Sequence, residues 1–163
     1  MITLQELLES RDRRAARQGE LLSQFPGRVL LCLTVQLPGP EKRNSLSLKI
    51  AEEGVKAVRD CFTPVFEELR DLPTGYEGFF MVCGEAIEIK KIASQLEETH
   101  PLGRLIDLDV ICPEGPVGRA DIGLPERRCL LCNKPARYCM RAGSHTREEL
   151  MAKINELVRE YEL

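Results

Sequence analysis

Residues 104–113 read RLIDLDVICP, an apolar run of strand length in which two aspartates alternate with branched apolar side chains. Successive side chains of a strand point to opposite faces of a sheet, so Asp107 and Asp109 are expected to share one face. The apolar residues between them would then fill the other face, against a core. The pattern predicts a sheet with one buried face and, at this strand, one acidic face.

Helical and strand patterns alternate along the rest of the chain, which predicts helices packed on one sheet in an α+β or α/β arrangement. Capping boxes and apolar spacing predict helices at 3–25, 45–62, about 64–71, 85–100 and 146–161. Apolar and β-branched runs predict further strands at 28–37 and 77–84. A length of 163 residues suits one domain, residues 1–163.

Composition excludes several classes of protein. The net charge of −3 gives no bulk attraction for nucleic acid or an anionic membrane, and the absence of tryptophan argues against base-stacking platforms. No apolar stretch approaches the roughly 20 residues of a membrane span, and the N-terminus lacks the pattern of a signal peptide. We therefore expect a cytoplasmic protein. Its seven cysteines are expected to be buried thiols or metal ligands rather than disulfides.

The aspartate pair is interpreted either as a metal site or as an ordinary acidic strand face. Residues i and i+2 of a strand are roughly 7 Å apart at Cα, close enough for two carboxylates to bind one Mg²⁺ that substrate phosphates complete. Gly103 would allow a phosphate to approach the backbone, and Arg104 would bind it. A half-buried strand with a solvated acidic face is the plain alternative. An Asp-x-Asp glycosyltransferase is disfavoured, because the chain leaves little room for separate donor and acceptor regions.

A Cys-rich segment occupies residues 128–145. Cys129, Cys132, Cys139 and His145 follow a Cys-x2-Cys-x6-Cys-x5-His order that suits a closed tetrahedral Zn²⁺ site, which would be structural. Reduced thiols packed in the core are the alternative. Six basic residues and no acids lie between Arg127 and Arg147, a distribution that suits polyphosphate or an acidic partner, or simply a solvated surface.

Four motifs in order resemble a known family. HPLGRLIDLDVI (100–111), GLPERRCLLCNKPARYCMR (123–141), RAARQ (14–18) and PGPEK (38–42) are similar to the holo-acyl-carrier-protein synthase of citrate lyase, also called apo-citrate lyase phosphoribosyl-dephospho-CoA transferase. The resemblance runs from about residue 4 to 150. It implies a single α+β domain with a nucleotidyltransferase-like mixed sheet flanked by helices, followed by the Cys-rich segment and a terminal helix.

The resemblance also implies a reaction. The family transfers the phosphoribosyl-dephospho-CoA group from 2′-(5″-triphosphoribosyl)-3′-dephospho-CoA to a serine of the acyl carrier (gamma) subunit of citrate lyase, releasing diphosphate. Asp107 and Asp109 would hold Mg²⁺, and Asp121 would be a third carboxylate. Beside Gly103 and Arg104, Lys42 and Arg119 are candidate phosphate ligands. The alternatives are the equivalent transferase of malonate decarboxylase and a non-catalytic, zinc-stabilised partner-binding module.

Overall fold

Five strands pair into one sheet in the computed structural model, which describes residues 1–162. They are β1 (Val29–Val35), β2 (Phe66–Leu72), β3 (Gly75–Val82), β4 (Ile106–Cys112) and β5 (Gly115–Val117), in the order β2-β3-β1-β4-β5. The expected α+β class on one sheet is confirmed. All four pairings are antiparallel within the described residues, where a mixed sheet was expected. Tight turns join β2 to β3 and β4 to β5, and strands joined in this way can only run in opposite directions.

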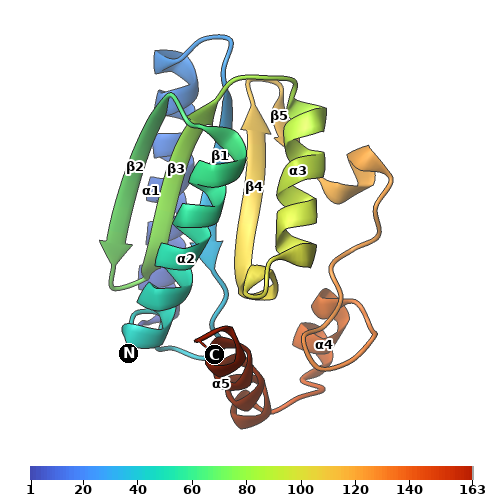
Figure 1. Ribbon diagram of the computed structural model, residues 1–163. Coiled ribbons are helices and arrows are strands. Elements are labelled where there is room, and N and C mark those ends of the chain that lie inside the picture. Colours follow the sequence, from blue (N-terminus) through green and yellow to red (C-terminus); the bar gives the residue numbers. More distant parts are fainter. Residues whose placement is uncertain (163) are drawn as a thin grey trace.

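Helices cover the two faces of the sheet unequally (Figure 1). Helix α1 (Leu4–Gln24) lies behind β1, β2 and β3, whereas α2 (Ser45–Phe62) and α3 (Ala86–Thr99) cover the front. The chain ends in a short α4 (Ala136–Ala142) and in α5 (Arg147–Glu162). Two 3-10 turns, η1 (Gly103–Leu105) and η2 (Arg119–Ile122), lie on either side of β4 and β5 in the chain.

The alternation predicted for β4 is confirmed. Ile106, Leu108 and Val110 are each about 1% exposed and belong to the larger core, which α2, α3 and α5 share. Asp107 and Asp109 point to the opposite face, where the smaller core lies under α1. Within residues 1–162, α1 packs on β1 rather than on β4.

The helix expected at about 64–71 is wrong, because these residues form the edge strand β2. Glutamate and leucine favour helices locally, but pairing with β3 over the whole length of β2 overrides that preference. Thr63 adopts a left-handed conformation that ends α2 and turns the chain. The charged side chains of β2 are paired across the structure, as Glu68 is with Arg17 at 3.0 Å.

None of the helices in residues 1–162 combines the length with the apolar character needed to cross a membrane.

Candidate functional site

A row of polar side chains crosses three strands on the face that carries α1. Asp107 of β4 stands opposite Thr34 of β1, and Thr34 stands opposite Glu77 of β3. Neighbouring strands are about 4.8 Å apart, so this register places a carboxylate two strands from Asp107. Asp109 follows in the next row, opposite Cys32. The sheet therefore gathers three carboxylates on one face.

Asp107 is held by two side chains. Arg127 donates from Nη1 to Asp107 Oδ1 at 2.5 Å, and the Gln36 side-chain amide donates to Oδ2. Asp109 is exposed and makes no hydrogen bond or ion pair with any side chain of residues 1–162. One carboxylate is thus oriented by the protein, while its neighbour on the same face keeps its oxygens for a ligand.

Partial desolvation acts on both aspartates, although solvent reaches Asp109 from one side. Burial raises the pKa of Asp107 above its ordinary value, and the charge of Arg127 opposes the rise. Burial likewise raises the pKa of Asp109, against the charge of Lys90. A cation bound between them would favour the charged form of both groups.

A cavity next to this row is lined by cations. Arg11 and Arg14 of α1 reach it from one side, and Lys42 reaches it from the loop after β1. Gln36, which donates to Asp107, and Glu77 also line the cavity, so it adjoins the acidic row. Burial lowers the pKa of Lys42, and the charges of Arg11 and Arg147 lower it further. An anion in the cavity would relieve this crowding of positive charge.

The three cations of the cavity differ in their intramolecular partners. Arg14 pairs with Glu77 at 3.3 Å. Lys42 Nζ donates to the Leu37 carbonyl at 2.6 Å. Arg11 makes no ion pair with any residue from 1 to 162, so its guanidinium is available to a ligand.

The other predicted phosphate ligands have structural partners. Arg104 donates to the carbonyls of Arg128 and Cys129, both at 2.9 Å, and so fastens the Cys-rich segment to η1. Arg119 pairs with Glu97 at 2.9 Å and with Glu98 at 3.0 Å. In this structure both arginines hold the protein together.

Asp121 lies in η2 and is exposed. Its Oδ2 accepts a hydrogen bond from the Gly118 backbone N–H at 2.7 Å, which closes the turn. No contact connects it with Asp107 or Asp109 among the described residues.

Gly103 is buried beneath the last turn of α3. A Cβ at this position would lie 2.3 Å from the carbonyl oxygen of Glu97 and 2.6 Å from that of Leu96. The glycine therefore allows η1 to pack against the backbone of α3.

We expect Gly103→Ala to destabilise the protein by about 1–3 kcal/mol, because backbone atoms cannot move aside as a flexible side chain can. Gly19→Ala is the matched control, since a Cβ at that helical position meets nothing within 4 Å. That change is expected to stabilise the protein by up to about 1 kcal/mol. Urea unfolding of both variants measures the difference, and equal stabilities would contradict the packing role.

A buried ion network on α3 supports β4 along the edge that does not pair with β1. Strand β5 pairs with β4 only from Val110 onward, which leaves the Leu108 backbone without a strand partner on that side. Glu97 of α3 accepts the Leu108 N–H at 2.9 Å, and Lys90 donates to the Leu108 carbonyl at 3.2 Å. Glu97 also binds Arg119 and, at 3.4 Å, Arg127. Helix α3 thus takes the place of a neighbouring strand and fixes the residue between the two aspartates.

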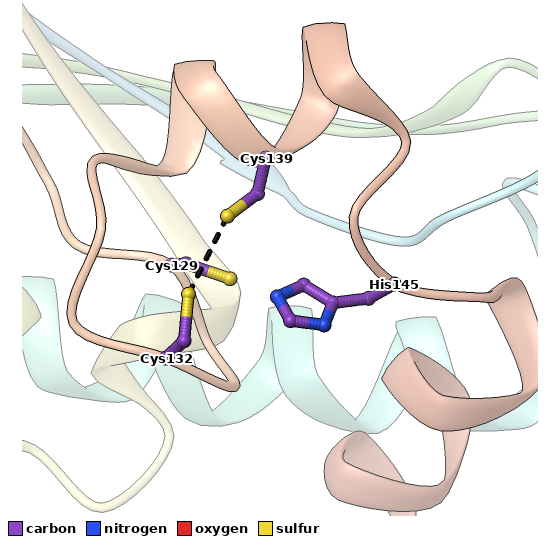
Figure 2. Close-up of side chains that lie close together, drawn as sticks. All are labelled: Cys129, Cys132, Cys139 and His145. Carbon is purple, nitrogen blue, oxygen red and sulfur yellow. Dashed lines mark hydrogen bonds between the residues drawn. The ribbon is translucent and has the colours of Figure 1, made fainter.

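The second candidate centre is the Cys-rich segment. Cys129, Cys132, Cys139 and His145 bring their ligand atoms within 4.8 Å of one another, as a bound metal ion requires. Figure 2 shows the imidazole of His145 turned towards the three sulfurs. The Cys132 and Cys139 sulfurs share a hydrogen bond at 3.4 Å and form no disulfide, since all seven cysteines are free thiols. The group is able to bind a metal.

The family model described as apo-citrate lyase phosphoribosyl-dephospho-CoA transferase matches residues 2–161. The chain belongs to this transferase family.

Curated relatives carry the same name. The transferase of Escherichia coli O1:K1 / APEC is 37% identical over 96% of this chain and 88% of its own length. Those of Escherichia coli O6:K15:H31 (strain 536 / UPEC) and Shigella boydii serotype 18 are 36% identical with the same coverage. The family recognised from four motifs is confirmed.

The motifs that carry the family resemblance converge in space. Arg14 from the RAARQ motif and Lys42 from the PGPEK motif line one cavity, and the acidic strand adjoins it through Gln36. Sequence reasoning missed Arg11 and Glu77 at this site. Arg11 precedes Arg14 by three residues and so shares its side of the helix, which is a signal that the sequence contains. Glu77 carries no local signal, because only the register of β3 against β1 brings it into the row.

Proposed function

We propose that this protein transfers the phosphoribosyl-dephospho-CoA group of 2′-(5″-triphosphoribosyl)-3′-dephospho-CoA to a serine of the acyl carrier (gamma) subunit of apo-citrate lyase. The serine Oγ attacks the α-phosphorus of the triphosphate, the bond from that phosphorus to the bridging oxygen breaks, and diphosphate leaves. The hydroxyl proton passes to a carboxylate of the site. The observation that carries the proposal is the pair Asp107 and Asp109 beside a cation-lined cavity, in a chain of this family.

Asp107 and Asp109 are the residues that would hold Mg²⁺. They share one face of β4, their donors are the hard oxygens that Mg²⁺ prefers, and Asp109 has no competing partner within residues 1–162. Bound there, the ion would neutralise charge on the reacting phosphates. Gln36 and Arg127 hold the Asp107 carboxylate in a fixed orientation for this purpose.

The triphosphate fits the cations of the cavity. We propose that Arg11, Arg14 and Lys42 bind its β- and γ-phosphates, because the cavity concentrates positive charge next to the acidic row. Phosphoryl transfer needs positioning and charge neutralisation more than covalent help from the protein, and these residues supply both. Arg104, Arg119 and Gly103 support the site as structural residues in this proposal.

A third carboxylate would accept the proton of the serine hydroxyl. Asp121 is the residue that the sequence predicts for accepting the hydroxyl proton. Glu77 is the stronger candidate, because it shares the sheet face of Asp107 and borders the cavity. Comparing the pH dependence of transfer by Glu77→Gln and Asp121→Asn would distinguish them.

A second metal suits the Cys-rich segment. Thiolate and imidazole donors favour Zn²⁺ over Mg²⁺, so we propose Zn²⁺ for the Cys3His group. The seven free thiols fit a reducing compartment, and we propose that the reaction takes place in the cytoplasm.

Mass spectrometry of the purified acyl carrier subunit tests the proposed reaction. After incubation with this protein, Mg²⁺ and the triphosphoribosyl precursor, we expect a mass increase equal to the phosphoribosyl-dephospho-CoA group on one serine. The acyl carrier subunit of malonate decarboxylase is the matched control, and it should stay unmodified. No mass increase on the citrate lyase subunit would contradict the proposal, and equal modification of both carriers would contradict the assigned partner.

A further inference from the structure

The four side chains of the Cys-rich segment form a closed ligand set. The Nε2 atom of His145 is buried, has no hydrogen-bond partner among residues 1–162, and faces the sulfurs (Figure 2). A buried polar atom without a partner is costly unless a ligand satisfies it. On the other side of the ring, Nδ1 lies 4.0 Å from the Glu149 carboxylate, the kind of group that orients a metal-bound histidine.

The sulfur spacing fits a tetrahedral ion. Zinc–sulfur bonds of 2.3 Å place tetrahedral sulfurs about 3.8 Å apart. The Cys132 and Cys139 sulfurs are 3.4 Å apart, and all four ligand atoms lie within 4.8 Å, so small side-chain rotations would centre an ion. With four protein ligands, no position remains for water or substrate, which makes the site structural.

Apart from the contacts of Arg104 and the packing of Leu130 on the larger core, the segment buries few apolar side chains. Helix α4 has seven residues, too few to be stable alone. It exposes the apolar side chains of Tyr138 (51%) and Met140 (80%), while Cys129 and Cys139 are the buried residues. A metal would therefore replace the hydrophobic core that this segment lacks.

The Cys3His group is flanked in the chain by two arginines that contact or lie near the candidate active site. Arg127, two residues before Cys129, binds Asp107 Oδ1 and the carbonyls of Ile106 and Gly103. Arg147, two residues after His145, packs directly on Gly39, where a Cβ would lie 2.5 Å from its Nε. Its charge also acts on Lys42 of the cavity. Both ends of the segment thus reach the site, one at the acidic row and one at the cationic cavity.

We propose that Cys129, Cys132, Cys139 and His145 bind one structural zinc ion, which locks the segment so that Arg127 orients Asp107 and Arg147 stands beside Lys42. Arg127 is a positioning residue in this arrangement, because it acts through Asp107. The effect of zinc on transfer rests on the proposed function, whereas zinc binding and the order of the segment do not.

Elemental analysis and limited proteolysis test zinc binding and the order of the Cys-rich segment without measuring transfer. We expect about one zinc ion per chain in the wild-type protein and less than about a tenth of that in Cys132→Ser/Cys139→Ser. The matched control is Cys61→Ser/Cys83→Ser, which changes two exposed thiols outside the group and should keep the zinc.

Trypsin should cleave after Arg137 and Arg141 at least about tenfold faster in the zinc-free variant, because a segment without its metal opens more often. Iron in place of zinc, equal zinc content in both double variants, or unchanged proteolysis would overturn the proposal.

Two further experiments distinguish the structural effect of zinc from its effect on the transfer reaction. Removing zinc from the wild-type protein with a chelator that prefers zinc to Mg²⁺ should accelerate the same cleavages and lower the rate of transfer roughly 10- to 100-fold. Adding zinc back should restore both the resistance to trypsin and the rate.

Arg127→Gln should keep the zinc yet lower kcat by a similar factor, with partial recovery in Arg127→Lys. Full transfer by zinc-free protein would overturn the positioning role. If the wild-type protein transfers nothing while its zinc and proteolysis behave as expected, the proposed function fails and the zinc site stands.

Discussion

Replacing Asp107 by asparagine is expected to lower the rate of prosthetic-group transfer at least about 100-fold. The substitution keeps the size of the side chain and one oxygen, but it removes the charge that would bind Mg²⁺ next to Asp109. It also weakens the contact with Arg127, which retains Glu97 and two backbone carbonyls as partners. We therefore expect the free energy of unfolding to change by less than about 1 kcal/mol. Rates are measured by mass spectrometry of the carrier subunit over time.

The matched control is Asp60→Asn, which makes the same change at an exposed position near the end of α2. It should transfer at the wild-type rate. Raising the Mg²⁺ concentration should partly restore Asp107→Asn if the loss comes from weaker metal binding. A variant that folds normally and transfers at the wild-type rate would rule out Asp107 as a metal ligand.

Glu97→Ala is expected to have the largest effect on stability, about 3–5 kcal/mol of the free energy of unfolding. Glu97 is buried, with its side chain 4% exposed, and it is the partner of the Leu108 N–H and of two arginines. Without it, the Leu108 N–H loses its acceptor and each of the two guanidiniums loses one of its anionic partners, in a place that water hardly reaches. Chemical denaturation monitored by circular dichroism measures the loss.

The neighbouring residue provides the control. Glu98 also pairs with Arg119, at 3.0 Å, but its side chain is 54% exposed. Water compensates for the loss of an exposed pair, so Glu98→Ala should cost less than about 1 kcal/mol. If the two variants were equally stable, the Glu97 network would not be what supports β4.

The sequence alone was sufficient for features that depend on local pattern. Alternation along 104–113 predicts which way Asp107 and Asp109 point, and capping boxes predict where α1 and α5 begin; the structure confirms both. The spacing of Cys129, Cys132, Cys139 and His145 predicts a group that the structure assembles. In each case the residues that decide the outcome lie within one element or one short segment.

Features that depend on distant partners could not be predicted in this way. Residues 66–72 have helical propensity, and only pairing with β3 makes them a strand. The structural partners of Arg104 and Arg119 lie more than 20 residues away in the chain, so the local sequence does not predict these contacts. A role of the two arginines as phosphate ligands stays a prediction. The packing of Gly103 against the backbone of α3 likewise depends on a helix that the local sequence around Gly103 does not contain.

The support of β4 by α3 has a consequence for the order in which the protein folds. Leu108 is 11 residues from Glu97 and 18 from Lys90, so this contact closes a short loop and can form early. The pairing of β4 with β1, which brings Asp107 to Gln36 across 71 residues, closes a far longer loop at a higher entropic cost. We therefore expect the helix–strand unit to form before the strand joins the sheet, which makes the acidic row one of the last features to assemble.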